Sequence, residues 1–115
     1  MGRLQELRRR QMKNMLNNGK YYVRLEADIR CTWHQEAPIY RVYVNDELFT
    51  ERTFIWTDCY LVESIQLQVD PGKYAVRIEM LPRFSCDFTA ENLRVVKGPA
   101  VIKKGWLLKV SEDLI

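Results

Sequence analysis

The sequence is poor in the residues that commonly build catalytic sites. Among 115 residues it has one histidine, His34, and five glycines, which do not cluster. A phosphate-cradling loop needs clustered glycines, and Ser–His or Cys–His catalysis would depend on His34 alone. No GxSxG motif is present, and the carboxylates form no recognisable pair. These gaps predict that the protein is not an enzyme.

The cysteines are also few. Cys31, Cys59 and Cys86 are odd in number and far apart in the sequence, whereas disulfide-stapled secreted modules usually carry more, in even number. We expect reduced thiols, mostly packed in the core. With His34 they form a nominal zinc set, but no paired CxxC motif is present. Cys31 and His34, three apart on an expected strand, point to opposite faces. We therefore predict no metal and no cofactor.

Long apolar runs are missing as well. No stretch approaches the roughly 18 apolar residues of a membrane helix, and the charged N-terminus lacks the apolar core of a secretory signal. The length fits one domain, and 47% hydrophobic with 29% charged residues is ordinary for a soluble globular protein. The sequence thus predicts no membrane partner, and a chain that folds where it is made, in a cytoplasm.

Positive charge is concentrated at the start of the chain. Residues 1–20 contain six basic residues against Glu6, a net charge of +5, so the remaining 95 residues sum to −2. Good helix formers and apolar residues at helical spacing predict a basic amphipathic helical arm over 1–19, ahead of a β-sandwich domain over 20–115. The arm carries the expected partner-binding residues, which are Leu4, Leu7, Arg8, Arg9, Arg10, Met12, Met15 and Leu16.

After the arm, the hydrophobic period changes to two. Residues 21–34 alternate apolar and polar, which predicts a long strand with one buried face. Residues 39–44 and 47–56 are expected to form a hairpin around Asn45-Asp46. Further strands are expected over 63–69, 74–80, 87–96, 100–103 and 105–110, with 63–69 and 74–80 paired as a second hairpin. The fold class predicted is mainly β, a single antiparallel jelly-roll-like β-sandwich with an N-terminal helical arm.

Aromatic residues divide between core and surface. Trp33 and Trp106 are expected to fill the core. Trp56 and Tyr60 flank a short polar segment, and they are the candidates for stacking on a sugar. Tyr22 and Tyr40 are expected on solvent-exposed faces.

Three segments carry a resemblance, namely "YRVYVNDELF", "VDPGKYAVRIEM" and "DFTAENLRVVKG". With them the chain resembles small jelly-roll or carbohydrate-binding-module-like β-sandwich domains. Through the segments "ERTFIW" and "DPGKYAVR" it is also similar to small uncharacterised proteins of tailed bacteriophages, including T4-like phages of cyanobacteria, which implies a location in a virion or a host cytoplasm. The resemblance covers about half of the chain and implies a virion or accessory role, with sugar binding as a further property. It implies no catalytic residue.

The sequence therefore favours a non-enzymatic phage structural or accessory protein that acts through protein–protein contacts. The arm is expected to dock on a neighbouring subunit, either a second copy of this chain or another protein. One alternative is a carbohydrate-binding module that uses Trp56 and Tyr60. Another is nucleic-acid binding through the basic residues between Arg8 and Lys13, although the arm lacks the interleaved aromatics of single-strand binders.

Overall fold

The computed structural model describes residues 20–57 and 59–114, which form a mainly β protein. The expected arm over 1–19 lies outside the described residues. Within them there is no α-helix, and one 3₁₀ turn, Glu112–Leu114, follows the last strand. The strands are β1 (Tyr21–Thr32), β2 (Ile39–Val44), β3 (Glu47–Thr53), β4 (Tyr60–Val69), β5 (Gly72–Met80), β6 (Asp87–Lys97), β7 (Ala100–Lys103) and β8 (Leu107–Val110).

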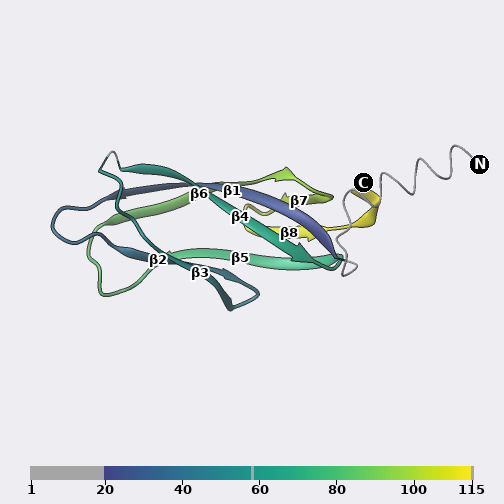
Figure 1. The fold of residues 1–115 in the computed structure, drawn as a ribbon, viewed down its shortest axis with the longest axis horizontal. Helices are drawn as coiled ribbons and strands as arrows, with labels where there is room; N and C mark the ends of the chain where they lie inside the picture. The colour runs from purple at the N-terminus through teal and green to yellow at the C-terminus, as the bar shows by residue number, and fades with distance from the viewer. Residues whose placement is uncertain (1–19, 58, 115) are drawn as a thin grey trace, which may run out of the picture.

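The strands form two sheets with antiparallel pairing throughout. One sheet has the order β4-β1-β6 and the other β3-β2-β5-β8-β7. Figure 1 shows β1, β4 and β6 in one layer and β2, β3 and β5 in the other. The predicted mainly β, antiparallel fold class is thus confirmed.

The core forms where the inner faces of the two sheets meet. The alternation over β1 is confirmed, because its apolar set is buried while Arg30 and Thr32 are exposed. One buried cluster combines side chains of both sheets, among them Val23, Leu25, Ile65 and Leu67 from the first and Val42, Val76 and Leu108 from the second. Burying each such leucine, isoleucine or valine contributes about 1.5–3 kcal/mol, so this cluster holds the sheets together.

The first hairpin is confirmed. Val44 pairs with Glu47, and the two turn residues between them, Asn45 (φ 51°) and Asp46 (φ 64°), adopt left-handed backbone. Asparagine and aspartate tolerate this conformation well, and two such residues make the turn that matches strand twist. The Asn45 side-chain oxygen also accepts a hydrogen bond from the Ala75 backbone N–H at 2.8 Å, which fastens the turn to β5.

The second predicted hairpin is wrong. The strands exist and the turn at Asp70–Pro71 is tight, but β4 pairs with β1, and β5 pairs with β2 and β8. The chain therefore crosses from one sheet to the other at this turn. The reason is that Leu67 on β4 and Val76 on β5 both bury their side chains in the shared core, each from its own sheet. Turn chemistry alone does not distinguish a hairpin from such a corner between sheets.

Three aromatic predictions need correction. Trp106 is not in the core but 48% exposed, since Lys104 and Gly105 form a left-handed turn and β8 begins only at Leu107. Trp33 is half-buried beside the cluster around Phe54. Tyr40, expected on an exposed face, is buried because β2 turns that side chain toward the core.

Candidate functional site

The side of the molecule between β3 and β4 is open. β3 is the outermost strand of the five-stranded sheet and β4 an outer strand of the three-stranded sheet, so among the described residues each has one unpaired edge. Two hollows lie between these edges. The first, of about 580 Å³, is lined by residues 51–53 of β3, residues 61–64 and 66 of β4, Tyr40, and Ile55 and Trp56 of the loop that joins the strands. The second, of about 320 Å³, is lined by residues 47–49 and 67–69, together with Val44, Asn45 and Tyr74. We call the two hollows together the β3–β4 groove.

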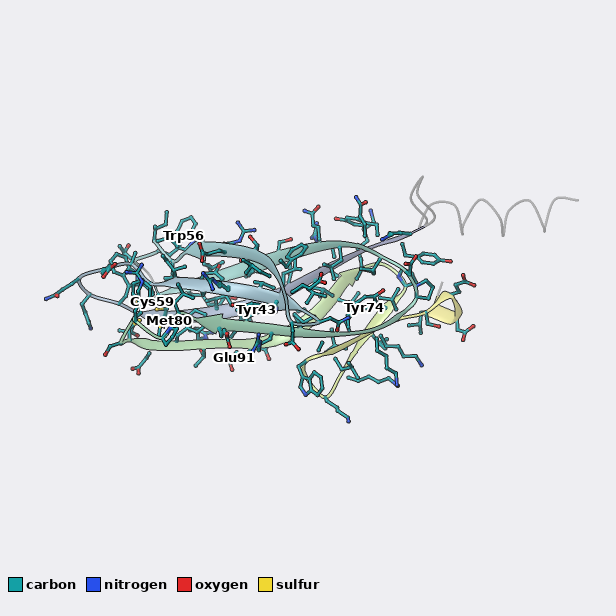
Figure 2. All side chains as sticks on the ribbon, turned by 90° about the horizontal axis from the view of Figure 1, so that it is seen from below. Tyr43, Trp56, Cys59, Tyr74, Met80 and Glu91 are labelled. Atoms are coloured by element: carbon teal, nitrogen blue, oxygen red, sulfur yellow. The ribbon has the colours of Figure 1, made fainter. Side chains whose placement is uncertain are left out.

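Apolar side chains are unusually exposed along this groove. Large apolar residues that are more than 40% exposed line both hollows, and they are Leu48, Phe49, Ile55, Trp56 and Val62. Figure 2 shows Trp56 and Tyr74, one from each hollow, toward opposite ends of the molecule. Exposed apolar residues gathered in one place, rather than scattered singly, are typical of an interaction surface. The groove is therefore the candidate functional site.

A buried carboxylate lies at the base of the first hollow. Glu63 is 3% exposed on the inner face of β4. Its Oε1 accepts hydrogen bonds from the Tyr40 hydroxyl at 2.9 Å and from Arg52 Nε at 2.6 Å. A buried carboxylate is costly unless it is paired and hydrogen-bonded, and here both conditions are met. The three residues come from β4, β2 and β3, so this cluster links the two sheets at their open side.

Burial and the adjacent negative charge of Glu63 raise the pKa of Tyr40 well above its ordinary value. Tyr40 therefore remains a protonated hydrogen-bond donor over the whole physiological range. The Arg52 side chain, by contrast, is half-exposed. Its guanidinium is held in place by Glu63 while keeping further N–H donors for a ligand in the hollow.

The two sugar-binding candidates are placed differently. Trp56 lines the first hollow, and its backbone carbonyl accepts a hydrogen bond from Trp33 Nε1 at 3.1 Å. Tyr60 is not among the residues that line this hollow. Its hydroxyl donates to Asp28 Oδ1 at 2.9 Å, and the Arg30 guanidinium covers its ring at 4.7 Å. Trp56 is thus available to a partner, while Tyr60 already takes part in interactions on the outer face of the three-stranded sheet.

That outer face carries a second buried carboxylate. Asp28 accepts hydrogen bonds from Tyr60, from Asn92 Nδ2 at 2.9 Å and from Arg94 at 3.1 Å. Hydrogen bonds from Asn92 and Tyr60, with Arg94 contributing further, lower the pKa of Asp28. Asp28 is on β1, and its partners are on β4 and β6, so the cluster joins all three strands. Its carboxylate is fully engaged, which indicates a structural role.

The sequence analysis found no recognisable pair of carboxylates and did not single out Glu63. A signal was present in the pattern, because Glu63 precedes Ile65 and Leu67 at the same two-residue spacing and therefore lies on the apolar face. Its partners, Tyr40 and Arg52, come from another sheet and had no such signal.

The nominal zinc set is brought together only in part. Cys31 and Cys86 are adjacent, with their sulfur atoms 3.6 Å apart, whereas His34 is exposed. Within the described part of the chain, no group of three or more His, Cys, Asp or Glu residues could hold a metal ion. The predicted partner-binding residues between Leu4 and Leu16 lie outside the described residues.

Comparisons with protein-family models, with curated proteins and with solved structures gave no match. In the described ranges, no helix is long and apolar enough to cross a membrane.

Proposed function

We propose that the protein is a non-enzymatic structural or accessory component that assembles through protein–protein contacts. In this proposal the β3–β4 groove of one subunit receives residues 1–19 of a neighbouring copy. The observation that carries it is the row of exposed apolar side chains between two unpaired strand edges. An apolar groove of this kind accepts an amphipathic helix, which lays its apolar face against the exposed side chains.

The position of residues 1–19 supports them as the occupant. The described chain begins at Lys20, and Tyr21 pairs with Val69, which lines the second hollow. Residues 1–19 therefore leave the fold at one end of the groove. As the helix that the sequence predicts, 19 residues would be roughly 28 Å long, which presents the apolar anchors over several turns.

Charge complementarity also supports this occupant. The two hollows are lined by Glu47, Glu51 and Glu63 against Arg52, three negative charges and one positive, a net charge of −2. The first 20 residues carry +5. Opposite charges accelerate encounter and fix the orientation of the docked segment. Leu4, Leu7, Met12, Met15 and Leu16 would supply the apolar anchors.

For the finer fold we propose a β-sandwich, supported by the core cluster that both sheets share. Strands three apart in chain order, β1 with β4 and β2 with β5, pair with each other. This pairing favours an immunoglobulin-like arrangement over the jelly roll that the resemblance implied. The resemblance to bacteriophage proteins supports a place in a virion or in the host cytoplasm.

The test uses two full-length variants that are each defective on one side of the contact. Leu7→Asp/Met15→Asp removes anchors from the donor segment, and Ile55→Asp/Val62→Asp places charges in the acceptor groove. In sedimentation velocity we expect the wild type to be oligomeric, each variant alone to be monomeric, and an equimolar mixture to form a heterodimer. The mixture retains one intact donor and one intact groove, so docking between subunits predicts this rescue.

Val96→Asp is the matched control, because Val96 is 46% exposed on β6, away from the groove. It should leave assembly unchanged. The wild type could instead be monomeric, with a donor variant that melts at a lower temperature than the wild type. That result would mean that the segment docks on its own subunit. Variants that still assemble alone would overturn the proposed contact.

A second candidate function is carbohydrate binding, which the exposed Trp56 ring favours. Trp56 shares its hollow with the charged side chains of Glu51 and Arg52, a combination suited to stacking on a sugar ring and hydrogen bonding to its hydroxyls. Binding of the wild type, but not of Trp56→Ala, to a glycan array would support this function.

A further inference from the structure

Three sulfur atoms gather at one end of the core. Cys31 is buried on the inner face of β1, and Cys86 is half-buried just before β6. Their sulfur atoms are 3.6 Å apart, and Cys86 Sγ is also 3.4 Å from Met80 Sδ on β5. Figure 2 shows Met80 and Cys59 near this same end. The contact follows from the fold, since the pairing of Cys31 with Phe88 and of Thr32 with Asp87 brings the end of β1 beside the start of β6.

The third cysteine is engaged elsewhere. The Cys59 carbonyl accepts the backbone N–H of Cys31 at 3.1 Å, but its thiol lies 3.6 Å from the carbonyl of Thr57 in its own loop. A disulfide bond is about 2.05 Å long, so the Cys31 and Cys86 sulfurs need to approach by roughly 1.5 Å. Cys31 and Cys86 are therefore the two cysteines that are placed to form a disulfide bond.

Cys86 also faces an entry route. A hollow of about 340 Å³ on the surface is lined by Cys86 together with Trp33, His34, Glu36, Arg83 and Phe84. A small molecule in this hollow reaches Cys86 first, because Cys31 lies behind it at 2% exposure.

We propose that Cys31 and Cys86 form an intramolecular disulfide by exchange with a low-molecular-weight disulfide such as oxidised glutathione. The Cys86 thiol loses its proton to water and attacks one sulfur of the small disulfide, forming a mixed disulfide and releasing one small thiolate. Cys31 then loses its proton, and its sulfur attacks Cys86 Sγ and expels the second small thiolate. Both thiolates take up a proton, so two protein thiols are oxidised and one small disulfide is reduced to two thiols.

The order of the two steps follows from burial. Burial, reinforced by the neighbouring Cys86, raises the pKa of Cys31 to about 12. Cys31 is therefore a poor first nucleophile, but it is held against the sulfur that it attacks in the second step. The resulting bond joins residues 55 apart in the sequence, which restricts the unfolded chain and should raise the melting temperature by on the order of 10 °C.

The experiment counts thiols in the full-length protein. Reduced protein is incubated with mixtures of oxidised and reduced glutathione, quenched with acid, and labelled with maleimide under denaturing conditions for mass spectrometry. We expect loss of two of three thiols and a Cys31–Cys86 peptide in the digest. Cys59→Ser should also lose two thiols, whereas Cys86→Ser should form no internal disulfide. Cys31→Ala should accumulate glutathione on Cys86.

The Cys86→Ser variant and the peptide map of the wild type keep the test valid even if the buried Cys31→Ala substitution prevents folding. Retention of all three thiols in excess oxidised glutathione would overturn the proposal. A disulfide that includes Cys59 would overturn it too.

Discussion

Arg52 on β3 and Glu63 on β4 form an ion pair at 2.6 Å between the edge strands of two different sheets. The two strands are not hydrogen-bonded to each other through their backbones, so these side chains provide a link where the sheets lack one. The link lies at the base of a groove in which exposed apolar side chains stand among polar ones. The residues that link the two sheets therefore lie within the proposed contact surface.

Replacing Glu63 tests the stabilising part of this arrangement. Glu63→Ala leaves the buried Tyr40 hydroxyl without its acceptor and removes the partner of Arg52. We expect the free energy of unfolding to fall by about 2–4 kcal/mol, the lower part of the range for broken buried pairs because the half-exposed Arg52 can be solvated. Urea denaturation measures the change.

The control for this prediction is Glu51→Ala. Glu51 and Arg41 also form a short ion pair, at 2.7 Å, but both side chains are exposed. An exposed pair contributes less than about 1 kcal/mol. Equal losses in the two variants would mean that the buried cluster does not join the sheets as described.

The stability of the protein should depend on pH partly through the ionisation of Asp28. Its folded-state pKa lies below the ordinary value of 3.8 because Asn92, Tyr60 and Arg94 bind the charged form. The contribution of this carboxylate is therefore fully present above that ordinary value, and it is lost as pH falls through the lower folded pKa. Asp28→Asn should be less stable than wild type at pH 7, and the difference should shrink toward pH 2.

Urea midpoints measured from pH 7 to pH 2 would show this convergence. Glu91→Gln is the matched control, because Glu91 makes only an exposed ion pair with Arg30, at 3.6 Å, on the same face of the sheet. It should change the curve little. A gap between Asp28→Asn and wild type that persists unchanged into acid would contradict the lowered pKa of Asp28.

Phe54 and Trp56 are only two residues apart in the sequence, but Phe54 lies in the core and Trp56 at the surface. Replacing each of them tests this difference. Phe54 is completely buried, so Phe54→Ala should cost about 3–5 kcal/mol. Trp56 is 52% exposed, so Trp56→Ala should cost about 1 kcal/mol or less. The same Trp56 variant should weaken assembly in sedimentation experiments. A large loss of stability with unchanged assembly would show that Trp56 belongs to the core and not to the contact surface.

Much of the fold could be read from local sequence. The alternation over residues 21–34 predicted β1 and its buried face because strand geometry repeats every two residues. The Asn45-Asp46 turn predicted its hairpin because both residues tolerate left-handed backbone. These signals depend on neighbours in the chain, and such neighbours are visible in a sequence.

What could not be predicted depends on which strands meet. A link of two residues joins β2 to β3 as a hairpin and β4 to β5 as a corner between sheets, and the choice depends on the packing of the whole core. The groove, the pairing of Glu63 with Tyr40 and Arg52, and the contact between Cys31 and Cys86 all follow from this choice. Each of these features joins residues that are distant in the sequence, so no local pattern predicted it.

The last prediction concerns the basic residues between Leu7 and Met12. If residues 1–19 dock in a groove of net negative charge, Arg8, Arg9 and Arg10 contact the acidic side chains at its rim. Replacing the three arginines by glutamine should then weaken assembly moderately in low salt and hardly at all in high salt, because exposed rim charges are screened by ions. Leu7→Asp/Met15→Asp should instead abolish assembly at every salt concentration, because it removes apolar anchors. Sedimentation velocity in low and high salt distinguishes the two patterns.

A different outcome would contradict this prediction. Assembly could be unchanged in both variants, while the arginine variant loses salt-sensitive binding to a nucleic acid. That result would assign this segment to nucleic-acid recognition and leave the groove without its proposed occupant.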